Sequence, residues 1–283
     1  MDLTGRRQST NFEDRRSKGG GKVAGLGIGG AIIVGIIALL LGGNPTEVIE
    51  QLGSGAAGGT EYVATEQEEQ LKTFALQILA STEDVWSEEF RKMGRTYREP
   101  KLVLFHGSVQ SGCGGATSQT GPFYCSADES VYLDLDFFSQ MPKSLGAGGD
   151  FAYAYVIAHE VGHHVQHLLG TLDKAHNAMA RQSEADRNQT SVRLELQADY
   201  YAGVWGYHEN RLFGSLEQGD IEEAINAAQK IGDDYLQRRS SGSVAPESFT
   251  HGTSQQRVRW LSKGLQTGSV QGGDTFSPRY NAL

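Results

Sequence analysis

The pentapeptide His159-Glu160-Val161-Gly162-His163 has the residue types and the spacing of a metal site. On an α-helix, residues four positions apart share a face, so His159 and His163 can direct imidazole nitrogens at one zinc ion. Glu160 lies one step around the helix, where its carboxylate can reach a water on the metal without binding the metal itself. The pattern predicts two ligands and a general base for metal-assisted hydrolysis.

The surroundings of this pentapeptide predict that it is buried. Residues 150–167 form a largely uncharged stretch typical of a helix, with Asp150 placed to cap its start. The same five letters also arise by chance in exposed helices, but buried imidazoles need a partner, and a metal satisfies two at once. Gly162 costs a helix about 1 kcal/mol relative to alanine, so we expect another element to pack very close to it.

A catalytic zinc ion takes three protein ligands, and the third is expected from a second helix at residues 191–203. Glu195 and Asp199 are four residues apart on that helix. One face can therefore present a carboxylate ligand and, one turn later, a carboxylate that accepts a hydrogen bond from a ligand histidine. The alternative is a solvated acidic face, which the apolar neighbours oppose. These neighbours are Leu194, Leu196, Ala198, Tyr201 and Ala202.

With these residues assigned, the chain resembles the bacterial neutral zinc metallopeptidases of the YpfJ type over nearly its whole length. The pairing of HExxH with a downstream ExxAD is also similar to the gluzincin arrangement. The resemblance implies zinc ligands His159, His163 and Glu195, the base Glu160, and Asp199 as the partner of His159. The motifs that carry it are GRRQSTNFEDRR (5–16) and residues 111–138, 158–170, 195–206 and 248–261.

Hydrolysis through a tetrahedral intermediate benefits from a donor aimed at the developing oxyanion. Gluzincins often supply one downstream of the glutamate ligand, and His251 is the best-placed candidate, with Tyr200 and Tyr207 as alternatives. A purely structural role for His251 at a helix entry stays open. His164 and His167 flank the pentapeptide and are expected to pack or to support the ligands rather than bind metal.

The fold class expected from the resemblance and the patterns is α+β, a mostly helical zincin-like domain with a small sheet. Residues 66–93, 221–236 and 254–261 read as helices, and residues 101–106 as a strand. Residues 131–138 alternate between apolar and acidic side chains, which predicts a half-exposed strand. In zincin-like folds a strand in this place forms the cleft edge and pairs with an extended substrate; ordinary sheet interior is the alternative.

Four segments are predicted along the chain. Residues 23–43 lack charge and are long enough to cross a bilayer, which takes about 20 apolar residues. Six Lys or Arg precede them, so residues 1–22 are expected in the cytoplasm. Residues 44–60 read as a linker, and residues 61–283 as an extracytoplasmic zinc metallopeptidase domain, in the periplasm if the cell has one.

Two alternatives compete with this single-pass anchor in a bacterial inner membrane. One is a buried core helix, and the other is a cleaved signal peptide. Against a signal peptide, the polar segment before residue 23 is long and residues 41–45 make a poor cleavage site. Gly25 and Gly29 form a GxxxG pair that could bring two anchors together as a homo-oligomer.

The chain has two cysteines, Cys113 and Cys125. The predicted topology places both in an oxidising space, so we expect a disulfide between them, worth roughly 3 kcal/mol in the chain-entropy model. A thiolate zinc site is the alternative, but the spacing lacks the usual CxxC pair.

The formal net charge is −9, and the excess of acid lies in the body rather than in the basic first 22 residues. This argues against nucleic acid as a partner. The chain is predicted to be a Zn²⁺-dependent, membrane-anchored metallopeptidase that acts on a protein or peptide substrate. Two other classes stay open: a non-catalytic zinc-containing envelope binding module, and a zinc amidohydrolase acting on a non-peptide substrate.

Overall fold

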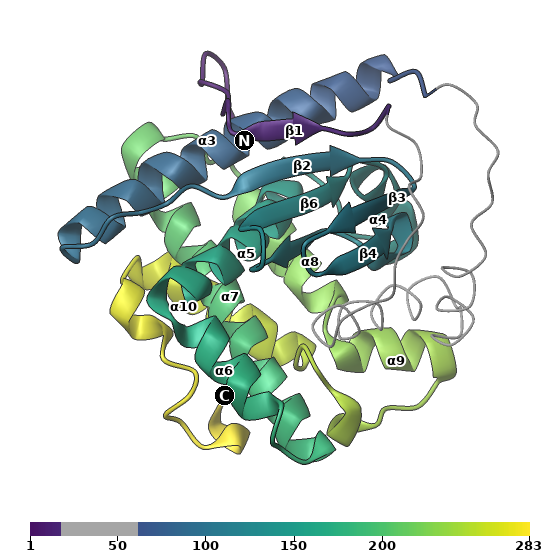
Figure 1. Ribbon diagram of the computed structural model, residues 1–283, viewed down its shortest axis with the longest axis vertical. Helices are drawn as coiled ribbons and strands as arrows, with labels where there is room; N and C mark the ends of the chain where they lie inside the picture. Colours follow the sequence, from purple (N-terminus) through teal and green to yellow (C-terminus); the bar gives the residue numbers. More distant parts are fainter. Residues whose placement is uncertain (18–61) are drawn as a thin grey trace.

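The computed structural model describes residues 1–17 and 62–283, which form a small sheet covered by helices (Figure 1). The strands lie in the upper half of Figure 1, and much of the helical part lies below them. This confirms the α+β class with mostly helical content. The strands are β1 (Phe12–Asp14), β2 (Lys101–Phe105), β3 (Ser108–Ser111), β4 (Gly114–Thr117), β5 (Phe123–Cys125) and β6 (Ser130–Asp134). The helices are α3 (Glu66–Lys92), α4 (Asp136–Leu145), α5 (Asp150–Leu169), α6 (Thr171–Met179), α7 (Glu184–Phe213), α8 (Asp220–Lys230), α9 (Asp233–Ser241) and α10 (Ser254–Thr267).

The main sheet has four strands in the order β1-β2-β6-β5. β1, β2 and β6 are parallel, while β5 runs antiparallel to β6 and forms the end of the sheet. β3 and β4 make a separate antiparallel hairpin. β5 is therefore an edge strand, and it lies beside α5, the helix that carries the pentapeptide.

The predicted half-exposed strand at residues 131–138 is wrong in two respects. β6 has neighbours on both sides and all of its residues are buried, and α4 already begins at Asp136. Asp134, expected to face solvent, is 2% exposed because hydrogen bonds satisfy its carboxylate in the interior. Its donors are the backbone N–H groups of Gly107 and Asp136 and the hydroxyl of Ser118.

The predicted helices at 66–93 and 254–261 and the strand at 101–106 are present as α3, α10 and β2. The single helix expected at 221–236 is instead two helices, α8 and α9, separated at Gly232. A Cβ atom on Gly232 would lie 2.3 Å from the backbone nitrogen of Ser254. The chain therefore turns where α8 and α9 meet the start of α10.

The N-terminal residues pack on the body of the protein. β1 pairs with β2 in parallel, and Arg6 forms an ion pair with the fully buried Glu209 of α7, with 2.7 Å between Nη1 and Oε1. Two hydrogen-bonded strands lie on the same side of a membrane. The expectation that residues 1–22 are separated from the body by a bilayer is therefore corrected for residues 1–17.

The predicted anchor at 23–43 and the linker at 44–60 lie outside the described residues. Within residues 1–17 and 62–283, none of the helices combines the length and the apolar character needed to cross a membrane.

Candidate metal centre

Helices α5 and α7 bring the predicted ligands together. His159 and His163 lie one turn apart on α5, and Glu195 faces them from α7. The helices cross closely because Gly162 has no side chain: a Cβ atom there would lie 2.9 Å from the carbonyl oxygen of Ala198. The expectation that another element packs against Gly162 is confirmed.

The distances between the ligand atoms fit a zinc ion. Glu195 Oε2 lies 3.2 Å from His159 Nε2, and Glu195 Oε1 lies 3.4 Å from His163 Nε2. Two atoms at about 2.0–2.1 Å from a tetrahedral zinc ion are roughly 3.3–3.4 Å apart, so each pair is spaced as along a tetrahedron's edge. One carboxylate and two imidazoles form the donor set of a site with a fourth, open position.

The charges of these groups favour a cation between them. Burial acts to lower the pKa of His159, but Asp199 and Glu195 outweigh it and raise the pKa to about 10. The pKa of His163 is also raised, because Glu195 outweighs burial. Burial would raise the pKa of Glu195, yet His251, His163 and His159 hold it well below its usual range. Both imidazoles therefore sit where positive charge is stabilised, which a divalent metal would supply.

Glu160 lines the pocket next to the ligands without belonging to the ligand group. Its side chain is buried, and burial raises the pKa of the carboxyl group. The neighbouring histidines and a hydrogen bond from the Tyr124 backbone act in the opposite direction. A buried carboxylate with a raised pKa suits proton transfer, as the sequence predicted for this residue.

Each ligand histidine is oriented by a partner on its other ring nitrogen. His159 Nδ1 donates to Asp199 Oδ1 at 2.8 Å, the partnership that the resemblance implied. His163 Nδ1 donates to the side-chain oxygen of Gln166 at 2.9 Å. Such partners fix the tautomer and ring orientation of metal-binding histidines. Gln166 was not predicted from the sequence, although its position three residues after His163 places it on the same face of the helix.

Two further residues that the sequence analysis missed surround Asp199. The Tyr155 hydroxyl donates to Oδ1 at 2.6 Å, and the Arg257 guanidinium donates to both carboxylate oxygens. Tyr155 lies one turn before His159, which the helical spacing could have indicated. Arg257 comes from α10, and only its place in the 248–261 motif pointed to it.

His251 lies at the pocket, as expected for an oxyanion donor. It is held by Asp233, the first residue of α9, with 3.4 Å between Asp233 Oδ1 and His251 Nδ1. The other Asp233 oxygen accepts the backbone N–H groups of Thr250, His251 and Gly252 at 2.7–2.9 Å. The loop before α10 is therefore fixed, and Nδ1 of His251 faces Asp233. The alternative donors are not at the pocket: Tyr200 bonds to Thr267 and Ser269, and Tyr207 lies elsewhere.

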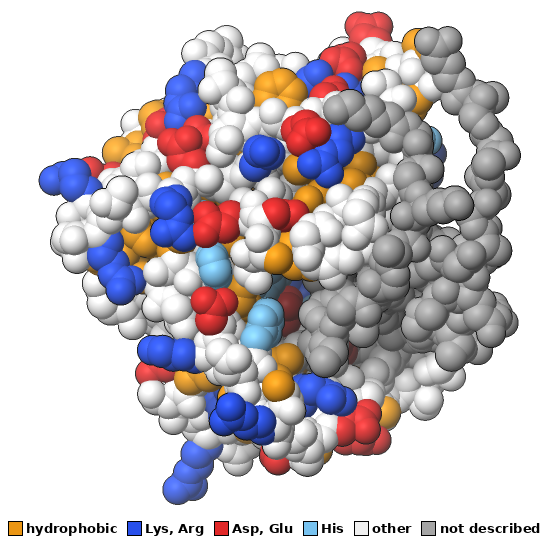
Figure 2. All heavy atoms as spheres, viewed as in Figure 1, with side chains coloured by type: hydrophobic (Ala, Val, Ile, Leu, Met, Phe, Trp, Pro, Cys, Tyr) orange, Lys and Arg blue, Asp and Glu red, His pale blue; other side chains and the backbone are white. Residues whose placement is uncertain are grey.

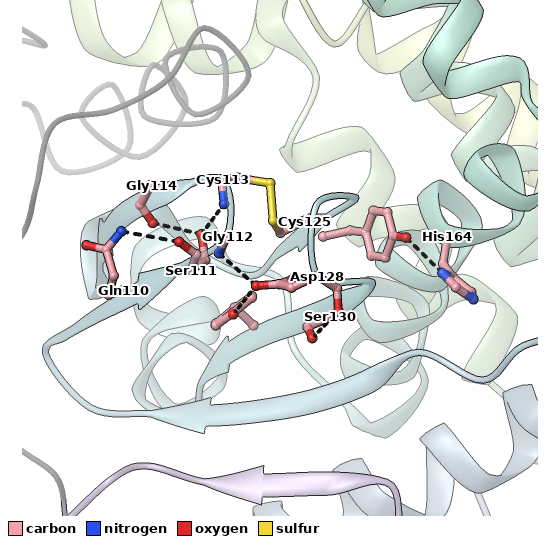
Figure 3. The surroundings of a disulfide bond; sticks show 11 residues. Gln110, Ser111, Gly112, Cys113, Gly114, Cys125, Asp128, Ser130 and His164 are labelled. Atoms are coloured by element: carbon pink, nitrogen blue, oxygen red, sulfur yellow. Dashed lines mark hydrogen bonds between the residues drawn. A yellow bond between two sulfur atoms is a disulfide. The ribbon is translucent and has the colours of Figure 1, made fainter.

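The expected disulfide between Cys113 and Cys125 is present (Figure 3). It joins the β3–β4 hairpin to the edge strand β5, and residues 120–122 between the two cysteines line the pocket. Asp128 supports the same region by accepting hydrogen bonds from Gly112 N and the Tyr132 hydroxyl. The disulfide thus braces one wall of the cleft.

The neighbouring histidines have other partners, as expected. His164 is fully buried and bonds through Nδ1 to the Tyr124 hydroxyl (Figure 3). Its Nε2 bonds to the Arg98 carbonyl. His167 contacts Glu129 and Asp173. Histidine and acidic side chains also lie close together on the face below the sheet in Figure 2.

A second group within the described residues brings ligand atoms within 4.8 Å of one another: Glu68, His106 and Asp136. Both oxygens of Glu68 already accept hydrogen bonds, one from Tyr62 and the other from Thr65. His106 and Asp136 are exposed on their side-chain surfaces by 44% and 38%. The buried group at His159, His163 and Glu195 is the better metal site.

Comparison with known proteins agrees with this geometry. Residues 1–276 match the model of the family described as putative neutral zinc metallopeptidase. The chain belongs to this family. Membership in the zinc metallopeptidase family supports hydrolase, metallopeptidase and zinc chemistry at the family level.

Relatives of this family member occur in distant bacteria. It is 48% identical to the uncharacterized protein YpfJ of Escherichia coli K12, over 98% of this chain and 99% of the relative. It is 44% identical to the uncharacterized protein Rv2575 of Mycobacterium tuberculosis H37Rv, over 64% of each chain. No solved structure matches the chain.

Proposed function

We propose that this protein is a zinc-dependent peptidase whose ligands are His159, His163 and Glu195. The observation that carries the proposal is the pair of distances, 3.2 and 3.4 Å, from the Glu195 oxygens to the two histidine nitrogens. A zinc ion bound there would polarise a substrate carbonyl and lower the pKa of a water to about 7.

The side chains around the ligands supply the remaining steps. Glu160 takes the proton of the attacking water and delivers it to the leaving amine, which its buried carboxyl group with a raised pKa suits. His251, held by Asp233, stabilises the oxyanion that develops on the substrate carbonyl. Together these residues hydrolyse an amide bond in two proton transfers.

The cleft favours a peptide over a sugar-linked amide. Apolar side chains from several elements line part of its walls, which suits the side chains of a peptide. β5 replaces the strand at 131–138 as the edge strand next to the cleft, and the segment just before it, residues 120–122, lines the cleft where an extended substrate would lie. The apolar lining residues are Pro122, Phe137, Val156 and Ile231.

We propose further that the segment at 23–43 attaches the chain to a membrane. The packing of residues 1–17 on the body supports an arrangement in which both lie on the same side of that membrane. The disulfide between Cys113 and Cys125 supports an oxidising compartment for both.

The test uses the full-length protein, because residues 1–17 belong to the folded body. Zinc content and cleavage of a peptide library are measured for the wild type, Glu160→Gln, Glu195→Ala and His167→Gln. We expect one zinc per chain in the wild type. Glu160→Gln should keep zinc and lose cleavage by about 10²- to 10⁴-fold, and Glu195→Ala should lose zinc.

His167→Gln is the matched control, because His167 shares α5 but contacts only groups outside the ligand set. It should keep both zinc and cleavage. Equal cleavage by Glu160→Gln and the wild type would rule out Glu160 as the base. Tight zinc binding without cleavage of any peptide would favour a binding module or a non-peptide substrate.

A further inference from the structure

The guanidinium group of Arg257 lies inside the protein, at the wall of the pocket. The residue is 2% exposed and belongs to α10, which contributes no metal ligand. A buried arginine is costly unless its charge is paired and its N–H groups are bonded. Its partners therefore indicate what it does.

Arg257 holds the carboxylate of Asp199 at two points. Its Nε donates to Oδ2 at 2.8 Å, and its Nη2 donates to Oδ1 at 2.9 Å. Oδ1 also accepts from the Tyr155 hydroxyl at 2.6 Å and from His159 Nδ1 at 2.8 Å. These four donors hold the carboxylate in one orientation. The two-point contact with the planar guanidinium contributes most to this, because it fixes both carboxylate oxygens at once.

The position of Arg257 is itself determined by close helix packing. α10 meets α7 through Gly264, where a Cβ atom would lie 2.1 Å from the carbonyl oxygen of Tyr200. Tyr200 directly follows Asp199, so the backbone that carries the carboxylate and the helix that carries Arg257 are in contact. This close contact between α7 and α10 keeps the backbone of Arg257 beside the segment that carries Asp199.

We propose that Arg257 is a positioning residue that fixes the orientation of His159 through Asp199; this inference rests on the proposed zinc site. Arg257 also balances charge. It offsets the charge of the fully buried Asp199, while a divalent metal would offset those of Glu160 and Glu195.

The experiment compares Arg257→Met, Arg257→Lys and the wild type as full-length proteins. Zinc affinity is measured by competition with a chelator, and thermal unfolding is followed on the same samples. We expect Arg257→Met to weaken zinc binding by about 10- to 100-fold, as for other groups that orient a metal ligand. Arg257→Lys should restore part of the affinity, because it keeps the charge but not the two-point contact.

Arg259→Met is the matched control. Arg259 lies two residues along the same helix and donates to the Leu283 carbonyl instead of the site. Its zinc affinity should equal that of the wild type. If Arg257→Met and Arg259→Met lower thermal stability alike and leave zinc affinity unchanged, Arg257 is only structural and the proposal is overturned.

A double variant keeps the test decisive if Arg257→Met alone folds poorly. Asp199→Asn with Arg257→Met removes both charges together, so neither is left unpaired. If Arg257 acts through Asp199, the zinc affinity of the double variant should equal that of Asp199→Asn alone. Additive losses would contradict the proposal.

The outcome also separates this proposal from the peptidase proposal. Unchanged zinc affinity in Arg257→Met overturns the role of Arg257 and leaves the peptidase proposal standing. Weakened zinc binding in a protein that cleaves no peptide supports Arg257 and overturns the peptidase proposal.

Discussion

Gly162 of α5 lies directly against Ala198 of α7, with room for no side chain between them. A Cβ atom on Gly162 would approach the carbonyl oxygen of Ala198 to 2.9 Å and its Cα to 3.1 Å. Gly162 precedes the ligand His163, and Ala198 precedes Asp199. The distance between these two backbones therefore sets the distance between the histidine ligands and the acidic face of α7.

Gly162→Ala is expected to push the two helices apart, because rigid backbone atoms cannot yield to the new methyl group. We expect the free energy of unfolding to fall by about 1–3 kcal/mol and zinc affinity to fall with it. Urea unfolding and chelator competition measure the two effects.

Gly206→Ala is the control for this substitution. The nearest atom to its Cβ would be the end of the Leu265 side chain, which can move, and Gly206 is remote from the ligands. It should leave zinc affinity unchanged. Equal zinc affinity in Gly162→Ala and the wild type would show that the helix crossing does not set the ligand geometry.

The disulfide provides a second prediction. Cys113→Ser with Cys125→Ser frees the loop whose residues 120–122 line the pocket. We expect a loss of roughly 3 kcal/mol in the free energy of unfolding, with zinc retained because the ligands lie on α5 and α7. KM for a cleaved peptide should rise more than kcat falls, since the loop forms the wall of the cleft.

A phosphine reductant, which lacks the zinc-chelating thiols of a dithiol, should reproduce this change in the wild type and have no effect on the double variant. Loss of zinc on reduction would contradict the prediction, because it would mean that the disulfide supports the ligands rather than the wall.

The candidate ligand group could be predicted because it depends on helical spacing alone. His159, His163, Glu195 and Asp199 are each four residues from a partner on one helix, and the structure brings all four together. Arg257 could not be predicted in this way. Its role depends on the packing of α10 against α7, a contact between segments far apart in the sequence.

The strand at residues 131–138 shows why the sheet was harder to predict. Alternation predicts a half-exposed strand only if one face meets solvent, and β6 instead has partners on both edges and is buried throughout. Asp134 was predicted to face solvent because it is acidic. In the fold its carboxylate accepts hydrogen bonds from Gly107 and Ser118, and the sequence alone does not show that these residues lie beside it.

His164 predicts a pH dependence of stability. Burial lowers its pKa to about 4, from an ordinary value of 6.5, and outweighs the hydrogen bond to the Arg98 carbonyl, which acts to raise the pKa. The unfolded chain thus binds the proton more tightly, and stability present above pH 6.5 is lost as the pH falls towards 4. The loss from this group is at most about 3 kcal/mol.

Urea unfolding between pH 7.5 and 4 measures this loss, with His164→Gln as the variant that cannot titrate. The difference between wild type and variant should shrink as the pH falls. A constant difference over this range would mean that His164 does not titrate on unfolding.

The ion pair between Arg6 and Glu209 tests whether residues 1–17 pack on the body in the full-length protein. Glu209 is fully buried and also accepts hydrogen bonds from Ser81 and Ser215. Arg6→Met leaves this carboxylate without its cation, so we expect the free energy of unfolding to fall by about 3 kcal/mol. Arg15→Met is the matched control, because the side chains of Arg15 and its partner Glu13 are 30% and 34% exposed, and such an ion pair contributes less than about 1 kcal/mol.

Urea unfolding of full-length protein in detergent micelles measures both variants, and Arg6→Met with Glu209→Gln should recover part of the loss. If residues 1–17 were held across a membrane from the body, Arg6→Met and Arg15→Met would behave alike and Glu209→Gln would rescue nothing. A selective effect of Arg6→Met therefore requires that the N-terminal strand and the metal centre share one compartment.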